Sequence, residues 1–243
     1  MEISTPGRIC LFGEHQDYLG LPVVSMAISL RVKIVGEKRQ DRKIVIHKPD
    51  LKETETFSLD NLDYTNNRDY FKSGIRICQR MGISFVNGVE CEIKSKIPFQ
   101  AGTSSSSAIV VGWINFLAQL VDPPPKWSTK KIGELAYLAE SVEFGEPGGM
   151  MDQYTTACGG LIKIESEPNV SLQKIESKLG SFVLGDSCEP KKTLEILYRC
   201  KNLRMNILDK LKSVNPNFNL HTSTCEEDIS CLDEQEQSLF YAT

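Results

Sequence analysis

The sequence predicts an α+β protein, in which strands and helices are mixed without the regular alternation of a doubly wound sheet. Two patterns support this class. Residues 1–60 contain short segments in which apolar and polar side chains alternate, as they do in half-buried strands. Residues 68–81, 109–120 and 128–144 instead place apolar side chains at helical spacing. Apolar side chains make up 40% of the 243 residues, which is enough for a sizeable core.

The first part of the chain is expected to be mainly strand, with one helix. A helix is predicted over 68–81, because apolar side chains recur there every three or four residues and Gly82 follows as a stop. Alternating apolar and polar side chains predict strands at 30–34, 43–47, 54–59 and 89–94.

Two further helices are predicted in the middle of the chain. Residues 109–120 are apolar on nearly every side, which indicates a helix that is buried all round. Pro123–Pro125 end it. The next helix is expected to begin after Ser128 or Thr129 and to stop at Gly145. Its predicted buried stripe consists of Ile132, Leu135, Ala136, Ala139 and Val142.

The last part of the chain is expected to contain two more strands and then helix. The strands are predicted at 160–164 and 181–185. From Glu189 onward the spacing is helical, apart from a polar break around 215–227.

Charge and cysteine content exclude several classes of protein. The 28 basic and 32 acidic side chains give a net charge of −4 and form no Lys/Arg block, which disfavours a nucleic-acid binder. No apolar run approaches the roughly 18 residues of a membrane span, and residues 1–7 lack a signal-peptide pattern. The eight cysteines include no CxxC pair and only three histidines are present. We therefore expect a cytoplasmic protein with reduced thiols and no zinc site.

Residues 98–108 are the first of three segments that carry side chains suited to chemistry. Gly102 is followed by Thr103 and a run of serines, and the segment leads directly into the predicted buried helix. The unpaired N–H groups and the dipole of a helix N-terminus attract phosphate. This segment is therefore a candidate phosphate site, although it contains no Walker A pattern. The alternative is a capped loop that binds nothing.

Residues 7–18 are the second segment, and they cluster Arg8, Glu14, His15 and Asp17 next to apolar strand residues. Buried or half-buried charges persist where they are paired or bind a ligand. Carboxylates beside a histidine can bind sugar hydroxyls, and an arginine can hold a carboxylate or a phosphate. The alternative is a solvated loop of charges.

Residues 139–153 are the third segment. Glu140 lies at the edge of the predicted buried stripe, where its carboxylate can lean into a cleft. Asp152 follows a Gly-Gly turn and two methionines. The alternative for Asp152 is a cap of the helix that follows.

Taken together, the three segments resemble the signature motifs of galactokinases, within the GHMP kinase superfamily of galactose, homoserine, mevalonate and phosphomevalonate kinases. Residues 7–18 resemble G-R-x-N-x-I-G-E-H-x-D-Y, with Cys10 in place of Asn and Phe12 in place of Ile. Residues 139–153 are similar to A-E-x-x-x-x-G-x-P-x-G-x-M-D-Q, and the galactokinase spacing of twelve residues separates Glu140 from Asp152.

The serine-rich segment is similar to the second motif of the family, P-x-G-x-G-L-S-S-S-A. Three residues depart from that motif, namely Gln100, Ala101 and Thr103. The whole resemblance spans about residues 4–200.

The resemblance implies a role for each matching position. Asp152 would orient or deprotonate the anomeric hydroxyl of a sugar, and Arg8 would stabilise the transferring charge beside it. Sugar hydroxyls would be held by Glu14, His15, Asp17, Gly149, Asp152 and Tyr198. The phosphates of ATP would rest on Gly102, Ser104, Ser105 and Ser106. Mg²⁺ would be bound by Ser105 and Glu140, with Glu143 left open as the alternative carboxylate.

The resemblance also implies the two-domain GHMP kinase fold, with an N-terminal domain like ribosomal protein S5 domain 2. Residues 1–180 would form the ATP- and sugar-binding domain, and residues 181–243 part of the C-terminal domain. The family's third, glycine-rich motif is expected late in the chain, but no glycine follows Gly185. The resemblance therefore implies a chain that is truncated before this motif.

The activity implied by the resemblance is ATP-dependent phosphorylation of galactose at its anomeric hydroxyl. Related kinases act on arabinose, galacturonate, N-acetylhexosamines or mevalonate-like alcohols, so the acceptor stays open at this point. A non-catalytic sugar or nucleotide sensor with the galactokinase fold is a further alternative. The expected partners are a small sugar and ATP, without nucleic acid or membrane.

Overall fold

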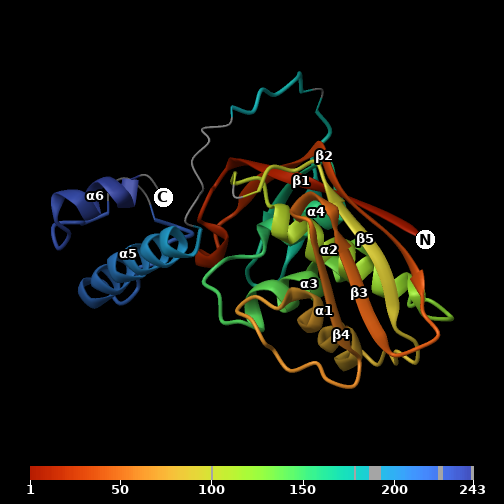
Figure 1. The fold of residues 1–243 in the computed structure, drawn as a ribbon. Coiled ribbons are helices and arrows are strands. Elements are labelled where there is room, and N and C mark those ends of the chain that lie inside the picture. Colours follow the sequence, from red (N-terminus) through yellow and green to blue (C-terminus); the bar gives the residue numbers. More distant parts are fainter. Residues whose placement is uncertain (100, 178, 186–192, 224–226, 242–243) are drawn as a thin grey trace.

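The structure is a computed structural model, and it describes residues 1–99, 101–177, 179–185, 193–223 and 227–241. A seven-stranded sheet forms one layer, and helices α1 to α4 pack against it (Figure 1). The last two helices, α5 and α6, lie beside this body at the opposite side from the N-terminus (Figure 1). The predicted mixture of strands and helices is therefore confirmed.

The sheet contains one long strand, β2, that serves as its centre. One edge of β2 pairs with β1, while the other pairs with β5 near the end of β2 and with β6 near its start. All strand pairs are antiparallel except β3 with β5. The strands are β1 (Glu2–Phe12), β2 (Val23–Lys38), β3 (Lys43–Lys48), β4 (Glu53–Ser58), β5 (Val89–Ser95), β6 (Leu161–Glu165) and β7 (Ser171–Lys174).

The helices include three short non-α turns. The α-helices are α1 (Tyr70–Arg80), α2 (Ser105–Leu120), α3 (Thr129–Tyr137), α4 (Met151–Cys158), α5 (Thr193–Val214) and α6 (Glu234–Tyr241). The turns are the 3₁₀ helices η1 (Asp17–Leu19) and η2 (Pro49–Leu51) and the π-helix η3 (Leu138–Val142), which continues α3 without a break.

The core lies on one face of the sheet, as the alternating strand patterns predict. On β2, Val32 and Ile34 are fully buried. The next residue, Val35, lies on the opposite face of the sheet and is 44% exposed. Helix α2 covers the buried face and is itself enclosed by α1, α3 and α4. Its Trp113 is fully buried and donates a hydrogen bond to the Phe71 carbonyl (3.0 Å). The prediction of a helix buried all round is confirmed.

The predicted buried stripe of the helix after Ser128 is correct only in part. Ser128 caps α3 by accepting a hydrogen bond from the Lys131 N–H, and Leu135 and Ala139 are buried. Val142 was expected in the same stripe but is 52% exposed, so that prediction is wrong. The reason is the π-turn η3, which adds a residue per turn and rotates everything after it. Glu140, four residues after the buried Ala136, is itself buried, as its place at the edge of the predicted stripe allows.

The strand predicted at 181–185 is absent, and these residues have no regular secondary structure. Phe182 and Val183 are both exposed, so this apolar run has neither a sheet edge to pair with nor a core to enter. The strand predicted at 160–164 is confirmed as β6, which pairs with the unpredicted β7.

The C-terminal helices have a small apolar cluster of their own. Ile207, Leu211, Phe218 and Leu232 form it and are buried between α5, α6 and the connecting loop. Tyr18 links this unit to the body, because the Lys201 ammonium group lies 5.7 Å from the centre of its ring.

Among the described residues, no helix is long and apolar enough to cross a membrane. The six described cysteines are free thiols, and Cys188 and Cys225 lie outside the described residues.

Candidate active site

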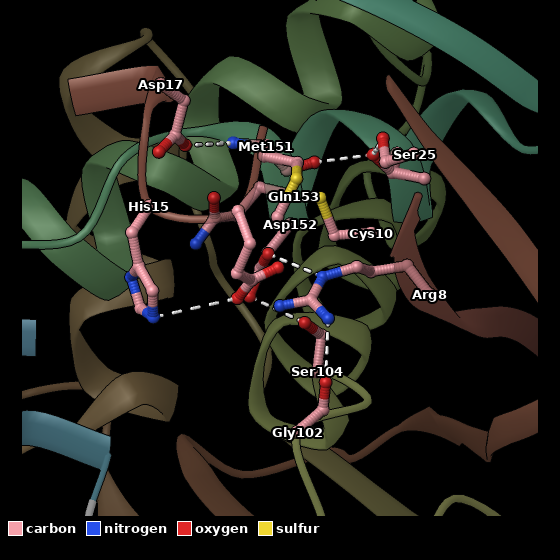
Figure 2. A network of polar contacts seen from close by, with 12 residues as sticks. Arg8, Cys10, His15, Asp17, Ser25, Gly102, Ser104, Met151, Asp152 and Gln153 are labelled. Carbon is pink, nitrogen blue, oxygen red and sulfur yellow. Dashed lines mark hydrogen bonds and ion pairs between the residues drawn. The ribbon is translucent and has the colours of Figure 1, made fainter. Parts of the chain in front are cut away.

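The serine-rich segment ends at the N-terminus of α2, as the sequence predicts. Ser104 is the N-cap residue and adopts a left-handed conformation (φ +58°) without capping the helix through its own side chain. Its hydroxyl instead donates a hydrogen bond to Asp152 Oδ2 (2.5 Å) (Figure 2). The first turn of α2 therefore keeps its unpaired N–H groups open at the place where Asp152 lies.

Arg8 joins all three segments that the sequence singled out, because it lies in residues 7–18 and contacts the other two. Its Nε donates to Asp152 Oδ1 (2.6 Å) and its Nη1 to the Gly102 carbonyl (2.7 Å) (Figure 2). Burial by itself lowers the pKa of Arg8, but the attraction and hydrogen bond of Asp152 outweigh it and raise the pKa above its usual value. Gly7 allows this approach, since a Cβ there would stand 2.9 Å from the Thr103 carbonyl oxygen.

Asp17 is buried, and its carboxylate is fixed by backbone donors. Oδ2 accepts from the Met151 N–H (3.0 Å), and Oδ1 accepts from the Tyr18 N–H (3.1 Å). Burial raises the pKa of Asp17 to about 6, although the Met151 hydrogen bond opposes the shift. Gly149 is required here, because a Cβ at that position would lie 1.9 Å from Asp17 Oδ2. The loop after β1 that carries Glu14, His15 and Asp17, here called the signature loop, and the turn before α4 therefore fit each other closely.

Glu140 points into the interior from the π-turn η3. It is 5% exposed, and its Oε2 accepts a hydrogen bond from Gln153 Nε2 (2.7 Å). Burial raises the pKa of Glu140 to about 7, against the lowering effect of hydrogen bonds from Ser106 and Gln153. The other amide atom, Gln153 Oε1, is buried without a hydrogen-bond partner among the described residues.

Glu143, the alternative carboxylate, is occupied elsewhere. It accepts two hydrogen bonds from Arg80 (2.6 and 2.8 Å) and one from the Tyr64 hydroxyl (2.6 Å). The hydrogen bonds from Arg80 hold the pKa of Glu143 below its usual range. Only Glu140 of the two lines the cavity described next.

A cavity of about 220 Å³, here called the central cavity, brings the three segments together. One predicted position, Tyr198, is not part of its lining: the side chain is 47% exposed, and Leu197 faces the cavity instead. The predicted positions that line it are Arg8, Glu14, His15, Asp17, Gly102, Ser104, Ser105, Ser106, Glu140, Gly149 and Asp152.

Several residues of the central cavity were not singled out from the sequence. Arg68 and Glu146 form a bidentate ion pair in its wall, and both lie at positions that no motif marks. Gln153 belongs to the third motif and lines the cavity, where it donates a hydrogen bond to Glu140. Cys10, which stands where the motif has Asn, is outside the lining; burial and Glu14 raise the pKa of its thiol to about 12.

Two family profiles match the chain over the segments that build this cavity. Residues 2–38 match the galactokinase galactose-binding signature. Residues 69–160 match the N-terminal domain of the GHMP kinases. The chain is a member of the GHMP kinase superfamily. The residues that match these two profiles include every position of the central cavity named above except Arg68 and Leu197.

Relatives within the GHMP kinases include enzymes for two kinds of acceptor. The galactokinase of Pyrococcus furiosus is 34% identical over 162 residues, which are 65% of this chain and 44% of the relative. The mevalonate kinase of Thermococcus gammatolerans is 27% identical over 218 residues, covering 86% of this chain and 64% of the relative. The chain thus spans less than half the length of the galactokinase that it matches.

A solved structure supports the fold. The galactokinase of Lactococcus lactis, crystallised with galactose, superposes with a TM-score of 0.77 at 20% identity. The superposition covers 98% of this chain and 65% of the other one. At this identity the likeness concerns the fold alone.

Proposed function

We propose that this protein transfers the γ-phosphoryl group of ATP to the anomeric hydroxyl of galactose or a closely related sugar. The observation that carries the proposal is the cluster of Arg8, Asp152 and Ser104 at the N-terminus of α2, within one cavity with the signature-loop residues. A base, a cation and an open helix N-terminus are the parts that phosphoryl transfer requires.

The sugar is expected on the side of the cavity formed by the signature loop. Glu14, His15 and Asp17 offer acceptors at that side, and a sugar presents a row of hydroxyl donors. Asp17 is held by the backbone of Met151, so its position is set before any ligand arrives. We expect such fixed acceptors to select the arrangement of hydroxyls rather than merely to hold a sugar.

The phosphates of ATP are expected at Gly102 and the first turn of α2, Ser104 to Ser106. The N–H groups and dipole of a helix N-terminus favour an anion there. Among the described residues no cluster of three or more His, Cys, Asp or Glu could hold a metal. This fits Mg²⁺, which takes one or two protein ligands and completes its shell with phosphate and water oxygens.

Glu140 and Ser105 fit the role of those protein ligands. Among the described residues, the buried Glu140 carboxylate forms no ion pair, and the neighbouring Gln153 Oε1 is buried without a hydrogen bond. Both observations describe a polar recess that a cation would satisfy. Bound Mg²⁺ would neutralise charge on the phosphate oxygens during transfer.

Asp152 and Arg8 would act on the acceptor. Asp152 would accept a hydrogen bond from the anomeric hydroxyl and aim its oxygen at the phosphorus, or take its proton as the bond forms. Arg8 holds Asp152 Oδ1, and its position beside the Gly102 carbonyl puts its charge next to the phosphate segment. Ser104 holds the other carboxylate oxygen, so the orientation of Asp152 is fixed from two sides.

Two other functions compete with this proposal. Phosphorylation of a mevalonate-like alcohol is favoured by the mevalonate kinase relative, whose match extends over more of this chain than that of the galactokinase. A sugar sensor would need the binding residues but no base, and the presence of Asp152 at the helix N-terminus favours the kinase.

A substrate panel tests the proposal. The purified chain is incubated with Mg²⁺-ATP and galactose, arabinose, galacturonate, N-acetylgalactosamine or mevalonate, and ³¹P NMR identifies the phosphorylated atom. We expect a 1-phosphate of galactose or of a related sugar, and turnover slower by about 10²–10⁴-fold with Asp152→Asn. Phosphorylation of mevalonate alone would establish the alternative acceptor. Sugar binding by calorimetry without any turnover would establish the sensor.

A further inference from the structure

The central cavity contains more negative than positive side chains. Five Asp or Glu residues line it, and the cations among its described lining residues are Arg8 and Arg68. Arg8 is engaged by Asp152 and by the Gly102 carbonyl, so it cannot turn toward a second ligand without releasing the base. A ligand with several negative charges would therefore bind more tightly if a further cation stood beside the helix N-terminus and the metal.

Arg68 borders the space next to the start of α2. It lines the central cavity and also a neighbouring cavity of about 330 Å³, here called the side cavity. Phe99, Ser105 and Ser106 are shared by the two cavities in the same way. The guanidinium of Arg68 thus stands where the cavities meet, beside the two serines that begin the helix.

The backbone at Arg68 adopts a conformation that side-chain-bearing residues rarely take, with φ +67°. Such strain persists only where the surroundings enforce it, and it concentrates at functional sites. Lys72 supplies the enforcement: its buried ammonium group contacts the Asp63 carbonyl (2.9 Å), the Thr65 hydroxyl (3.0 Å) and Asp69 (2.9 Å). The loop before α1 is therefore fixed so that Arg68 enters the cavity.

Glu146 is the ion-pair partner of Arg68. Nε and Nη2 of Arg68 donate to the two carboxylate oxygens of Glu146 (2.6 and 2.7 Å). Nη1 forms no hydrogen bond with the described residues. Side-chain exposure is 34% for Arg68 and 11% for Glu146, so the arginine is the more accessible member. The pair keeps a cation at the cavity wall while leaving one of its nitrogen atoms available.

We propose that Arg68 binds the phosphates of the nucleotide, and that Glu146 is a competing counterion that holds Arg68 in place while the cavity is empty. The inference rests on the proposed function, because it assigns to Arg68 the nucleotide of that reaction. A guanidinium forms bidentate hydrogen bonds with phosphate as readily as with carboxylate. Binding therefore replaces the bond to Glu146, wholly or at Nη1, by a bond to phosphate.

The proposal and a purely structural role of the pair predict opposite changes in nucleotide affinity for Glu146→Gln. If the pair only ties the loop before α1 to the turn before α4, removing either partner weakens nucleotide binding. If Glu146 competes with phosphate, Glu146→Gln strengthens binding, because Arg68 becomes free and one negative charge disappears. Arg68→Met weakens binding in both cases.

The test measures affinities for Mg²⁺-AMPPNP and for tripolyphosphate by calorimetry. We expect Arg68→Met to weaken both about 10–100-fold, the range for a lost hydrogen bond to a charged group, and Glu146→Gln to strengthen both about threefold or more. Arg80→Met is the matched control: Arg80, the last residue of α1, and Glu143, directly after η3, also form an Arg–Glu pair, but outside both cavities. It should lower the melting temperature and leave both affinities unchanged.

Each other result overturns the inference. Weaker binding by Glu146→Gln would reduce the pair to a structural tie, and unchanged binding by Arg68→Met would show that Arg68 does not contact the phosphates. Both results would leave the proposed function standing. If the unaltered chain bound neither polyanion, both Arg68 and the phosphate site would be misassigned. The substrate panel separates that failure from the first one, since a chain that transfers phosphate must bind ATP.

Discussion

The two sides of the central cavity differ in what they present to a ligand. The signature-loop side, made of Glu14, His15 and Asp17, offers carboxylate and imidazole acceptors. The helix-start side, made of Gly102 and Ser104–Ser106, offers hydroxyls and the N–H groups of the first turn of α2. A neutral molecule with many hydroxyl donors fits the first side, and an anion fits the second. The difference in charge between the two sides thus assigns the sugar to the first side and the phosphates of ATP to the second.

The two sides also differ in how they are held. Asp17 is fixed by backbone N–H groups, and Gly149 packs directly against its carboxylate. On the helix-start side, Ser104 is held by Asp152 and stands at a strained left-handed position. Asp152 therefore belongs to neither side and connects them. Substitutions on each side should accordingly affect different ligands, and substitution of Asp152 should affect only the transfer between them.

The largest expected effect is that of Asp152→Asn. Turnover should fall by about 10²–10⁴-fold, the usual consequence of losing a positioned base, while galactose and Mg²⁺-AMPPNP still bind within about tenfold. The side chain keeps its size, so both sides of the cavity stay in place. Single-turnover kinetics and calorimetry on the same preparation measure the two quantities. Near-full turnover by the variant would show that Asp152 does not serve the chemistry.

The second prediction compares two neighbouring glycines. A Cβ at Gly149 would lie 1.9 Å from Asp17 Oδ2, whereas a Cβ at Gly148 would meet nothing closer than 3.9 Å. Gly149→Ala should therefore displace the Asp17 carboxylate and weaken galactose binding about 10–100-fold, with little change in AMPPNP affinity. An orphaned buried acceptor costs about 1–3 kcal/mol, which corresponds to this range. Gly148→Ala should leave both affinities within about threefold.

Calorimetry with each ligand alone decides this comparison. Equal losses for galactose and AMPPNP in Gly149→Ala would mean that the signature-loop side does not bind the sugar specifically. A loss of the same size in Gly148→Ala would point to distortion of the whole turn before α4 rather than to Asp17.

Much of the body of the fold could be predicted because its local patterns and its tertiary packing agree. The alternation at 43–47 and 89–94 corresponds to strands with one buried face, and residues 109–120 fill the centre of the core. The run at 181–185 shows the limit: an apolar, β-prone segment forms a strand only if a sheet edge is available to it. Edges are properties of the assembled sheet and are not encoded locally.

The candidate site likewise contains some features that sequence motifs predict and others that depend on the folded chain. Motif positions such as Arg8, Asp17 and Asp152 could be placed in one cavity because the motifs themselves imply it. Glu140 could also be placed at the edge of a buried helical stripe, but the exposure of Val142 could not, because it depends on a π-turn that has no pattern of its own in the sequence. Arg68 and Glu146 are 78 residues apart, and only the folded chain brings them into contact. Pairs of distant charges leave no periodic signal.

The smallest expected effect is on stability, and it distinguishes Glu140 in the π-turn from Glu143, which directly follows the turn. Burial raises the pKa of Glu140 to about 7 from its ordinary value of 4.5. The folded chain therefore holds the proton more tightly than the unfolded chain between these pH values. The cost of burying the ionised carboxylate is present in full above about pH 7, and it fades as the pH falls toward 4.5.

Glu140→Gln should consequently raise the melting temperature of the free chain at pH 8 by about 2–4 °C, which is of order 1 kcal/mol, and by less at pH 5. The gain stays modest because a buried amide also loses its hydration. Glu143→Gln, three residues away, should do the opposite at pH 8, since it gives up an ion pair with Arg80 and its pKa is lowered rather than raised. Differential scanning fluorimetry at the two pH values measures both melting temperatures.

If Glu140→Gln destabilised the chain at pH 8, the buried carboxylate would already be stabilised by a contact within the protein. The variant that gains stability should also lose affinity for Mg²⁺-AMPPNP, because the charge that destabilises the free chain is the one proposed to hold the metal.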